Sequence, residues 1–321
     1  RSSAASDVYK RQDQFEVVMR DAAPRRVPSP TGIPVIPSVE IGPSGWDSIR
    51  LGGRRLVGGV AATLWRAPID NDGGSQSPDW QASNRSRWHH WGLDRLVPQW
   101  DEPHIERVDG DTRVTARGRL VSPDGRLDVP WERTVLIERS GRIRVDEVAS
   151  IPEELADVPR VGAVLELAEG LDHVQWWGLG PHECYPDRRA SGLVAVHSCS
   201  VDAMAEPLVH PQEHGVRLDI REAELVGPAG RVRVVSDPAG PLLHMRAGHY
   251  YDVDLERAPL ASDLPRRSTT ELHLDVAVRG IGTGSCGPDT LPEYRVGPGT
   301  YRWRWWLLVD DPHADQTSSG P

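Results

Sequence analysis

The sequence is poor in several residue types that would point to particular protein classes. Its 321 residues include one phenylalanine, three methionines, three cysteines and a single lysine. No continuous apolar stretch reaches the ~18–20 residues that a transmembrane helix needs, and no signal-peptide pattern is visible. The three cysteines (Cys184, Cys199 and Cys286) are widely spaced without a CxxC pair. This spacing favours reduced thiols over a disulfide framework or a zinc site, and we expect a cytoplasmic protein.

The charge balance is acidic and evenly distributed. Lys and Arg together number 37 against 47 Asp and Glu, which gives a net charge of −10. Nucleic acids and anionic membranes require a concentrated basic surface, and the chain has no block of like charges. We therefore expect neither of them as a partner.

The N-terminal residues differ in composition from the rest. Residues 1–12 contain the only lysine and resemble translated sequencing-adapter DNA, so we treat them as a non-native or disordered leader. Residues 13–38 contain five prolines and are typical of an interdomain linker or the end of a preceding domain. We expect one domain over residues 39–309 and a disordered tail over residues 310–321.

From residue 39 onward, short apolar runs separated by Gly, Pro and Asp predict many short strands. Residues 301–305 place three aromatic side chains on one strand face and two arginines on the other, while residues 272–276 alternate apolar with polar. Such strands are expected to cover a core with one face and to meet solvent with the other. Asp-Gly pairs at 109–110 and 124–125 predict hairpin turns, and residues 78–91 can hold a short helix. The predicted fold is all-β, a large antiparallel β-sandwich.

Three segments carry a family resemblance. Leu-Trp-Arg-Ala-Pro-Ile-Asp-Asn-Asp at 64–72, Gly-Leu-Gly-Pro-His-Glu-Cys-Tyr-Pro-Asp-Arg at 178–188 and Pro-Gln-Glu-His-Gly-Val-Arg at 211–217 occur in the order found in one family. They resemble the last domain, or small chain, of the glycoside hydrolase family 2 β-galactosidases. The motif positions to which a structural or interface role is assigned are Trp65, Arg66, Pro68, Asp70, Asn71, Asp72, Gly180, Pro181, Glu183, Tyr185, Asp187, Arg188, Gln212, Glu213 and Gly215.

The resemblance implies a supersandwich of the galactose mutarotase type. It implies retaining hydrolysis of β-galactosides such as lactose, with the two catalytic glutamates on a (β/α)8 barrel upstream of this domain. Mg²⁺ and Na⁺ are implied for the parent enzyme, but no catalytic or metal-binding motif of the family matches here. We therefore expect no catalytic or metal site in this chain, with the barrel, a β-galactoside sugar and further copies in an oligomer as partners.

Two glycine-containing segments invite other assignments. The segment 70–74 has the acids of a calcium loop, but an EF-hand would need Gly and Glu where Ser75 and Gln81 stand, so an Asx turn is favoured. The segment 280–287 lacks a following helix for phosphate binding and has Thr283 where a nucleophile elbow needs Gly. By resemblance, this loop reaches toward the active site and carries a tryptophan for sugar stacking, where this chain has Cys286. Ser285 and Cys286 are therefore candidates for the substrate rim, and a small buried thiol is the alternative for Cys286.

Other functions remain open at this point. Glu183, His182 and His210 could serve as acid and base in an aldose 1-epimerase, whereas the resemblance favours Glu183 as a residue that fixes a loop. The 12 tryptophans could indicate a stand-alone carbohydrate-binding module. Most of them are expected in the core, Trp176 and Trp177 on opposite strand faces, and a surface group is expected to comprise Trp80, Trp88, Trp91 and Trp100.

Overall fold

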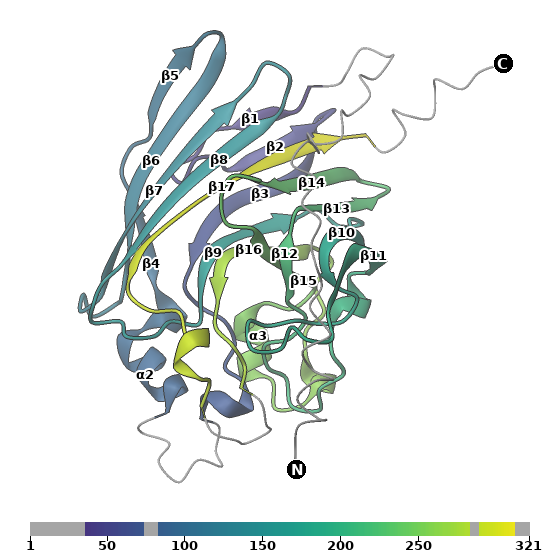
Figure 1. Cartoon of the computed structure of the whole chain (residues 1–321). Coiled ribbons are helices and arrows are strands. Elements are labelled where there is room, and N and C mark those ends of the chain that lie inside the picture. The colour runs from purple at the N-terminus through teal and green to yellow at the C-terminus, as the bar shows by residue number, and fades with distance from the viewer. Residues whose placement is uncertain (1–35, 74–82, 283–288, 312–321) are drawn as a thin grey trace, which may run out of the picture.

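The computed structural model describes residues 36–73, 83–282 and 289–311, which form two packed antiparallel sheets (Figure 1). The smaller sheet has seven strands, in the order β1 (Ser38–Glu40), β2 (Ser48–Leu51), β3 (Arg54–Thr63), β9 (Arg160–Leu167), β16 (Thr270–Val278), β15 (Leu243–Gly248) and β12 (Arg217–Ile220). The larger sheet has ten strands, in the order β11 (Leu193–Ser200), β10 (His173–Gly180), β13 (Glu222–Gly227), β14 (Gly230–Ser236), β17 (Gly299–Asp310), β8 (Ile143–Ile151), β7 (Asp128–Ile137), β6 (Asp111–Val121) and β4 (Val97–Trp100), with β5 (His104–Val108) also paired to β6. The predicted β-sandwich is confirmed.

Helices are short and lie outside the sheets, at the lower end of the molecule as drawn in Figure 1. The α-helices of the described residues are α2 (Asn84–Trp91) and α3 (Asp252–Arg257), and the 3₁₀ turns are η1 (Asp70–Asp72), η3 (Leu93–Arg95), η4 (Asp202–Met204), η5 (Ala261–Asp263) and η6 (Pro292–Tyr294). Helix α2 confirms the helix expected within residues 78–91. Ser83 caps it by accepting a hydrogen bond from the Ser86 N–H. Among the described helices, none combines the length and the apolar character that crossing a bilayer requires.

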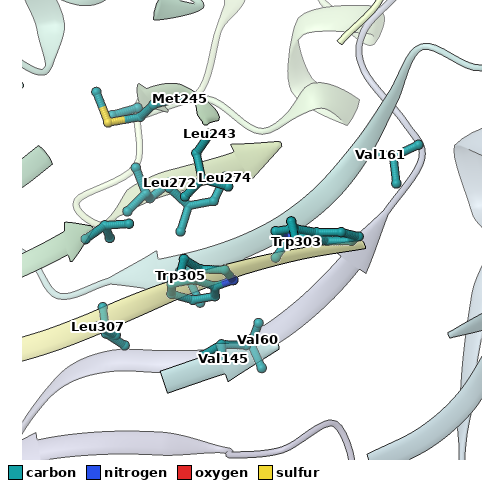
Figure 2. Close-up of a cluster of buried hydrophobic side chains, with 14 of the residues drawn as sticks. Val60, Val145, Val161, Leu243, Met245, Leu272, Leu274, Trp303, Trp305 and Leu307 are labelled. Atoms are coloured by element: carbon teal, nitrogen blue, oxygen red, sulfur yellow. The ribbon is translucent and has the colours of Figure 1, made fainter. Parts of the chain in front are cut away.

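The core lies between the two sheets, and β17 contributes its largest side chains. Trp303 and Trp305 are 3% and 0% exposed, and Figure 2 shows both on β17 within the cluster of buried side chains. The ring of Trp305 meets the ring of Trp46 edge-on at 6.3 Å, and Trp303 meets Trp131 at 5.7 Å. The alternation of residues 301–305 thus predicted the buried face correctly.

The turn chemistry also follows the sequence. Asp109 and Gly110 both have positive φ angles (52° and 90°), which is the geometry that joins β5 tightly to β6. Gly125, with φ of 72°, lies in the connection between β6 and β7. Trp176 is 2% exposed and Trp177 is 42% exposed, as expected for neighbours on opposite faces of a strand.

Two expectations are wrong. Trp88 was placed in a surface group, yet it is 1% exposed and its indole N–H donates to the Asp157 carbonyl at 3.1 Å. The polar face of residues 272–276 was expected in solvent, yet His273 and Asp275 are 2% and 0% exposed. The two errors have different causes: Trp88, on helix α2, packs against Trp65 and two arginine side chains, whereas segments outside the sheet cover the polar face of β16. Trp80 and Cys286 lie outside the described residues.

Candidate functional site

The motif residues leave the sheets at strand ends and meet in loops. Residues 64–72 follow β3, residues 181–188 follow β10, residues 211–216 precede β12, and residues 279–282 follow β16. The hydrogen bonds that join these four segments define the site.

Two buried arginines converge on Asp72. Arg66 Nη2 donates to both carboxylate oxygens of Asp72, at 3.2 and 3.0 Å, and neither side chain is exposed. Arg279 Nη1 donates to Asp72 Oδ1 at 3.2 Å. Both guanidinium groups also lie over the ring of Trp88, at 5.8 and 5.6 Å from its centroid. The Ile69 N–H donates to Asp72 Oδ2 at 2.9 Å, so this carboxylate also caps the start of η1.

Arg279 continues this network away from the motif. Its Nε donates to Asp157 Oδ2 at 2.7 Å and its Nη2 to Asp289 Oδ1 at 2.6 Å. Nη1 also donates to the Thr290 hydroxyl at 3.0 Å. One buried arginine therefore ties the end of β16 to Asp157 and to the segment that follows residues 283–288. Arg279 and Asp157 were not predicted, because no local pattern distinguishes them from solvent-facing residues.

The base of the 283–288 loop is held by two motif residues. Asp187 accepts hydrogen bonds from the backbone N–H groups of Ile281 (3.1 Å) and Gly282 (2.7 Å). Asn71 Nδ2 donates to the Ile281 carbonyl at 2.8 Å. A Cβ on Gly280 would lie 2.4 Å from Asp187 Oδ2, so the close approach requires glycine there. Ser285 and Cys286 themselves lie outside the described residues, and their assignment to a substrate rim stays a prediction.

The first and third motifs are joined at the surface. The Asp70 N–H donates to Gln212 Oε1 at 3.1 Å, and Gln212 Nε2 donates to Asp70 Oδ2 at 3.3 Å. Both side chains remain accessible to a partner. Trp65 packs edge-on against Trp88 at 6.3 Å and contributes to the core beneath this surface.

The second motif is a closed turn built on Glu183. Its Oε1 accepts from Arg188 Nη1 at 2.8 Å and its Oε2 from the Gly215 N–H at 2.9 Å, and burial raises the pKa of this carboxyl. A cis peptide bond joins Gly180 to Pro181. The Pro181 carbonyl accepts from Arg217 Nε at 2.9 Å.

The residues considered for epimerase chemistry have separate partners. His182 Nε2 is 2.8 Å from the Ser191 hydroxyl, and His210 Nδ1 is 3.4 Å from the Pro259 carbonyl. Both oxygens of Glu183 are engaged in the turn. Tyr185 is buried beside this turn, with 1% of its surface exposed. The hydrogen bonds of Glu183 to Arg188 and to the Gly215 N–H hold the loop in place, and they leave neither carboxylate oxygen free of a partner.

Glu213 belongs to a buried ionic cluster that the sequence did not reveal. Glu213 pairs with Arg160 and lies 3.8 Å from Arg246 Nε. Arg246 Nη1 contacts Asp252 Oδ1 at 3.2 Å and Glu271 Oε1 at 3.4 Å. These side chains come from β9, β15, β16, α3 and the 211–216 loop, so only the tertiary structure brings them together. Alternate polar residues at 271, 273 and 275 of one strand were the available signal.

Protonation in this cluster follows from burial. Burial and the neighbouring Arg160 lower the pKa of His273, whose Nε2 lies 2.8 Å from Glu271 Oε1. Burial raises the pKa of both Glu271 and Asp275 to about 7. Asp275 is 0% exposed, and its nearest cation is Arg160 Nε at 3.7 Å.

Three members of the cluster have the donor set of a metal site. The ligand atoms of Asp252, Glu271 and His273 lie within 4.8 Å of one another. However, Arg246 Nη1 already contacts both carboxylates. A guanidinium group between two carboxylates takes the place that a cation would need, and its charge would repel one. These residues therefore fit an ion-pair network better than a metal ion.

Comparison with known proteins places these segments in a family. The family described as "Beta galactosidase small chain" matches residues 43–307. The chain belongs to the β-galactosidase small-chain family. This match to the small-chain family covers all three motifs and every strand from β2 to β16, so the resemblance drawn from residues 64–72, 178–188 and 211–217 is confirmed.

Curated relatives of this small-chain domain are much longer than the chain. A β-galactosidase of Arthrobacter sp. (strain B7) is 31% identical over 299 residues, which cover 86% of this chain and 29% of that protein. A β-galactosidase of Psychromonas ingrahamii is 28% identical over 265 residues, covering 81% of this chain and 24% of that protein. The chain thus spans about a quarter of the length of the curated relatives it matches.

Solved structures give only a distant likeness to the small-chain domain. The galactose 1-epimerase from Lactobacillus acidophilus NCFM is 13% identical, with a TM-score of 0.43, over 86% of this chain and 91% of that one. A putative aldose 1-epimerase from Escherichia coli K12 is 10% identical with a TM-score of 0.40, over 83% of this chain and 92% of that one.

Proposed function

We propose that this chain is the C-terminal domain or small subunit of a β-galactosidase and acts together with a catalytic barrel. The barrel supplies the two glutamates of a retaining hydrolase, and Mg²⁺ and Na⁺ act in the parent enzyme. The chain closes one side of the active site. The observation that carries this proposal is the arrangement of family-motif side chains around the base of the 283–288 loop.

The motif side chains support this function because they hold the segments next to residues 283–288 in place. Asn71 and Asp187 hold the backbone of residues 281–282, and Arg279 anchors the other side of the loop through Asp289 and Thr290. Asp70 and Gln212 lie at the surface beside Asn71 and offer polar groups to a neighbouring domain. Side chains that hold the segments before and after residues 283–288 support a fixed position of this chain against a barrel.

Substrate contact is assigned to Ser285 and Cys286. A cysteine lacks the area and the π-face of the indole that the resemblance places there. We therefore expect weak binding of the leaving-group sugar in the assembled enzyme. Cys286→Trp should lower KM for a disaccharide such as lactose more than for a nitrophenyl galactoside, and equal effects on both would contradict a rim position.

A chimera tests the proposal. The corresponding domain of the Arthrobacter enzyme is replaced by residues 39–309, and hydrolysis of a nitrophenyl β-galactoside is measured. The chimera should be active, whereas this chain alone and the truncated enzyme alone should not. Activity of the isolated chain would contradict the accessory role, and an inactive but folded chimera would argue against closure of the active site by this domain.

The same isolated chain tests the two other functions. An epimerase would accelerate the interconversion of galactose anomers and would lose that activity in Glu183→Gln. A carbohydrate-binding module would bind galactose or lactose with a measurable Kd in titration calorimetry. We expect neither result.

A further inference from the structure

An apolar pocket of about 350 Å³ lies beside the third motif. One wall is formed by the segment 205–211, which precedes β12, and another by α3 and the turn η5 that follows it. Leu255 and Leu264 are among the lining side chains. The Ala261 N–H donates to the Val209 carbonyl at 3.1 Å and so joins the two walls. A pocket of this size can enclose a single long side chain or a small ligand.

Exposed apolar side chains continue the pocket toward solvent. Val209 is 78% exposed, and Leu260, next to the Ala261 that bonds to it, is 51% exposed. Single exposed apolar residues are ordinary on a protein surface. Here two of them adjoin an apolar pocket, which is the arrangement expected of a surface that a partner covers.

His214 presents a hydrogen-bond acceptor to this pocket. It is one of the lining residues and is 9% exposed. Its Nδ1 lies 2.8 Å from the Gln212 carbonyl, which can only accept, so Nδ1 carries the proton. Burial and the neighbouring Arg246 lower the pKa of His214, which keeps the ring neutral and Nε2 an acceptor. Nε2 has no hydrogen-bond partner within the described part of the chain.

A carboxylate and a phenol ring lie at the same pocket. Glu206 lines it and is close enough to His214 to raise the pKa of that imidazole. Across residues 36–73, 83–282 and 289–311, no cation forms a salt bridge with Glu206. Tyr250 also lines the pocket and offers an aromatic face, which attracts cations. The pocket therefore suits a group with an apolar stem and a cationic head that donates hydrogen bonds.

We propose that this pocket receives an arginine side chain from the catalytic part of the parent enzyme. The aliphatic stem of the arginine lies along Leu255 and Leu264, and its guanidinium donates to the Glu206 carboxylate and to His214 Nε2. A sugar has no apolar stem to cover these leucines and fits the pocket poorly.

Three observations argue for this occupant. The chain spans about a quarter of the length of its curated relatives, so the inference, which rests on the proposed function, has a large companion domain to supply the side chain. Pro211 lines the pocket, and the next residue, Gln212, pairs with Asp70 on the surface assigned to that domain. The net charge of −10 favours a cationic side chain from the partner.

The first test titrates the full chain, labelled at histidine, with n-butylguanidinium chloride at constant ionic strength. The ring signals of His214 should shift and saturate, and n-butanol, which has the same stem without the charge, should bind more weakly. Glu206→Gln should weaken the binding of n-butylguanidinium about fivefold. Glu102→Gln, at an exposed carboxylate outside the pocket, is the matched control and should bind as wild type does. Absence of a saturable shift, or equal binding of n-butanol, would overturn the proposal.

The second test compares amide hydrogen exchange in the full chain and in the chimera with the Arthrobacter enzyme. Residues 205–211 should exchange more slowly in the chimera because docking covers them, whereas residues 104–108 of β5, at the opposite end of the molecule in Figure 1, should exchange equally in both. An active chimera without this protection would overturn the docking proposal and leave the proposed function standing. Protection in an inactive chimera would support docking and contradict closure of the active site, so the two proposals fail separately.

Discussion

Arg66 Nη2 donates to both carboxylate oxygens of Asp72, six residues further along the first motif, and neither side chain is exposed. The pair lies where the motif turns back on itself, and Arg279, the residue after β16, joins it. Buried pairs of this kind gain little over an apolar core, but the loss of one partner leaves an uncompensated charge. The first prediction follows from this asymmetry.

Asp72→Asn should lower the free energy of unfolding by about 3–5 kcal/mol, because two buried guanidinium groups lose their shared anion. Urea unfolding of the isolated chain measures the change. The control is Glu132→Gln, which breaks an exposed pair with Arg117 (2.7 Å) and should cost less than about 1 kcal/mol. Equal effects of the two substitutions would contradict a structural role for Asp72.

Asp187→Ala should free the base of the 283–288 loop, because the N–H groups of Ile281 and Gly282 lose their acceptor. Hydrogen exchange at these two amides should become faster, while exchange at the core strand β17 stays unchanged. Asp187→Asn keeps one acceptor oxygen and should give an intermediate rate. Unchanged exchange in Asp187→Ala would show that this carboxylate does not hold the loop.

His89 connects α2 to α3 and should make stability depend on pH. Its Nε2 lies 2.7 Å from Glu256 Oε1, and this hydrogen bond raises the pKa of His89 above 6.5. The stabilisation is fully present below pH 6.5 and is lost as the pH rises through the higher folded-state pKa. His89→Gln should abolish this dependence. The measurement is urea unfolding of both proteins over the neutral and alkaline range, and parallel curves would count against the pair.

Asp275 should contribute to pH dependence from within the ionic cluster. Burial raises its pKa from 3.8 to about 7, so the folded state binds a proton that the unfolded state has lost. The stabilisation is complete below pH 3.8 and is lost as the pH rises through about 7. Asp275→Asn should therefore be more stable than wild type at pH values above about 7, with a flatter profile. A less stable Asn variant there would show that the carboxylate is ionised and needed by Arg160.

The local sequence was sufficient to predict individual strands and turns of the fold. Alternation placed Trp303 and Trp305 in the core, and Asp109-Gly110 predicted the turn between β5 and β6. These features depend on backbone periodicity and on turn dihedral angles, which neighbouring residues set. The three motifs were sufficient for the family because their order along the chain is itself specific.

Only the tertiary structure showed which charged and polar side chains are buried and which partners they have. His273 and Asp275 occupy the face of β16 that alternation assigned to solvent, but α3 and the 211–216 loop cover it. Arg279 has no local signal either, and two of its partners, Asp72 and Asp157, come from segments more than 100 residues away. Strand periodicity determines which side a residue faces. Whether that side meets water, an ion pair or the core depends on segments that fold over it from elsewhere in the chain.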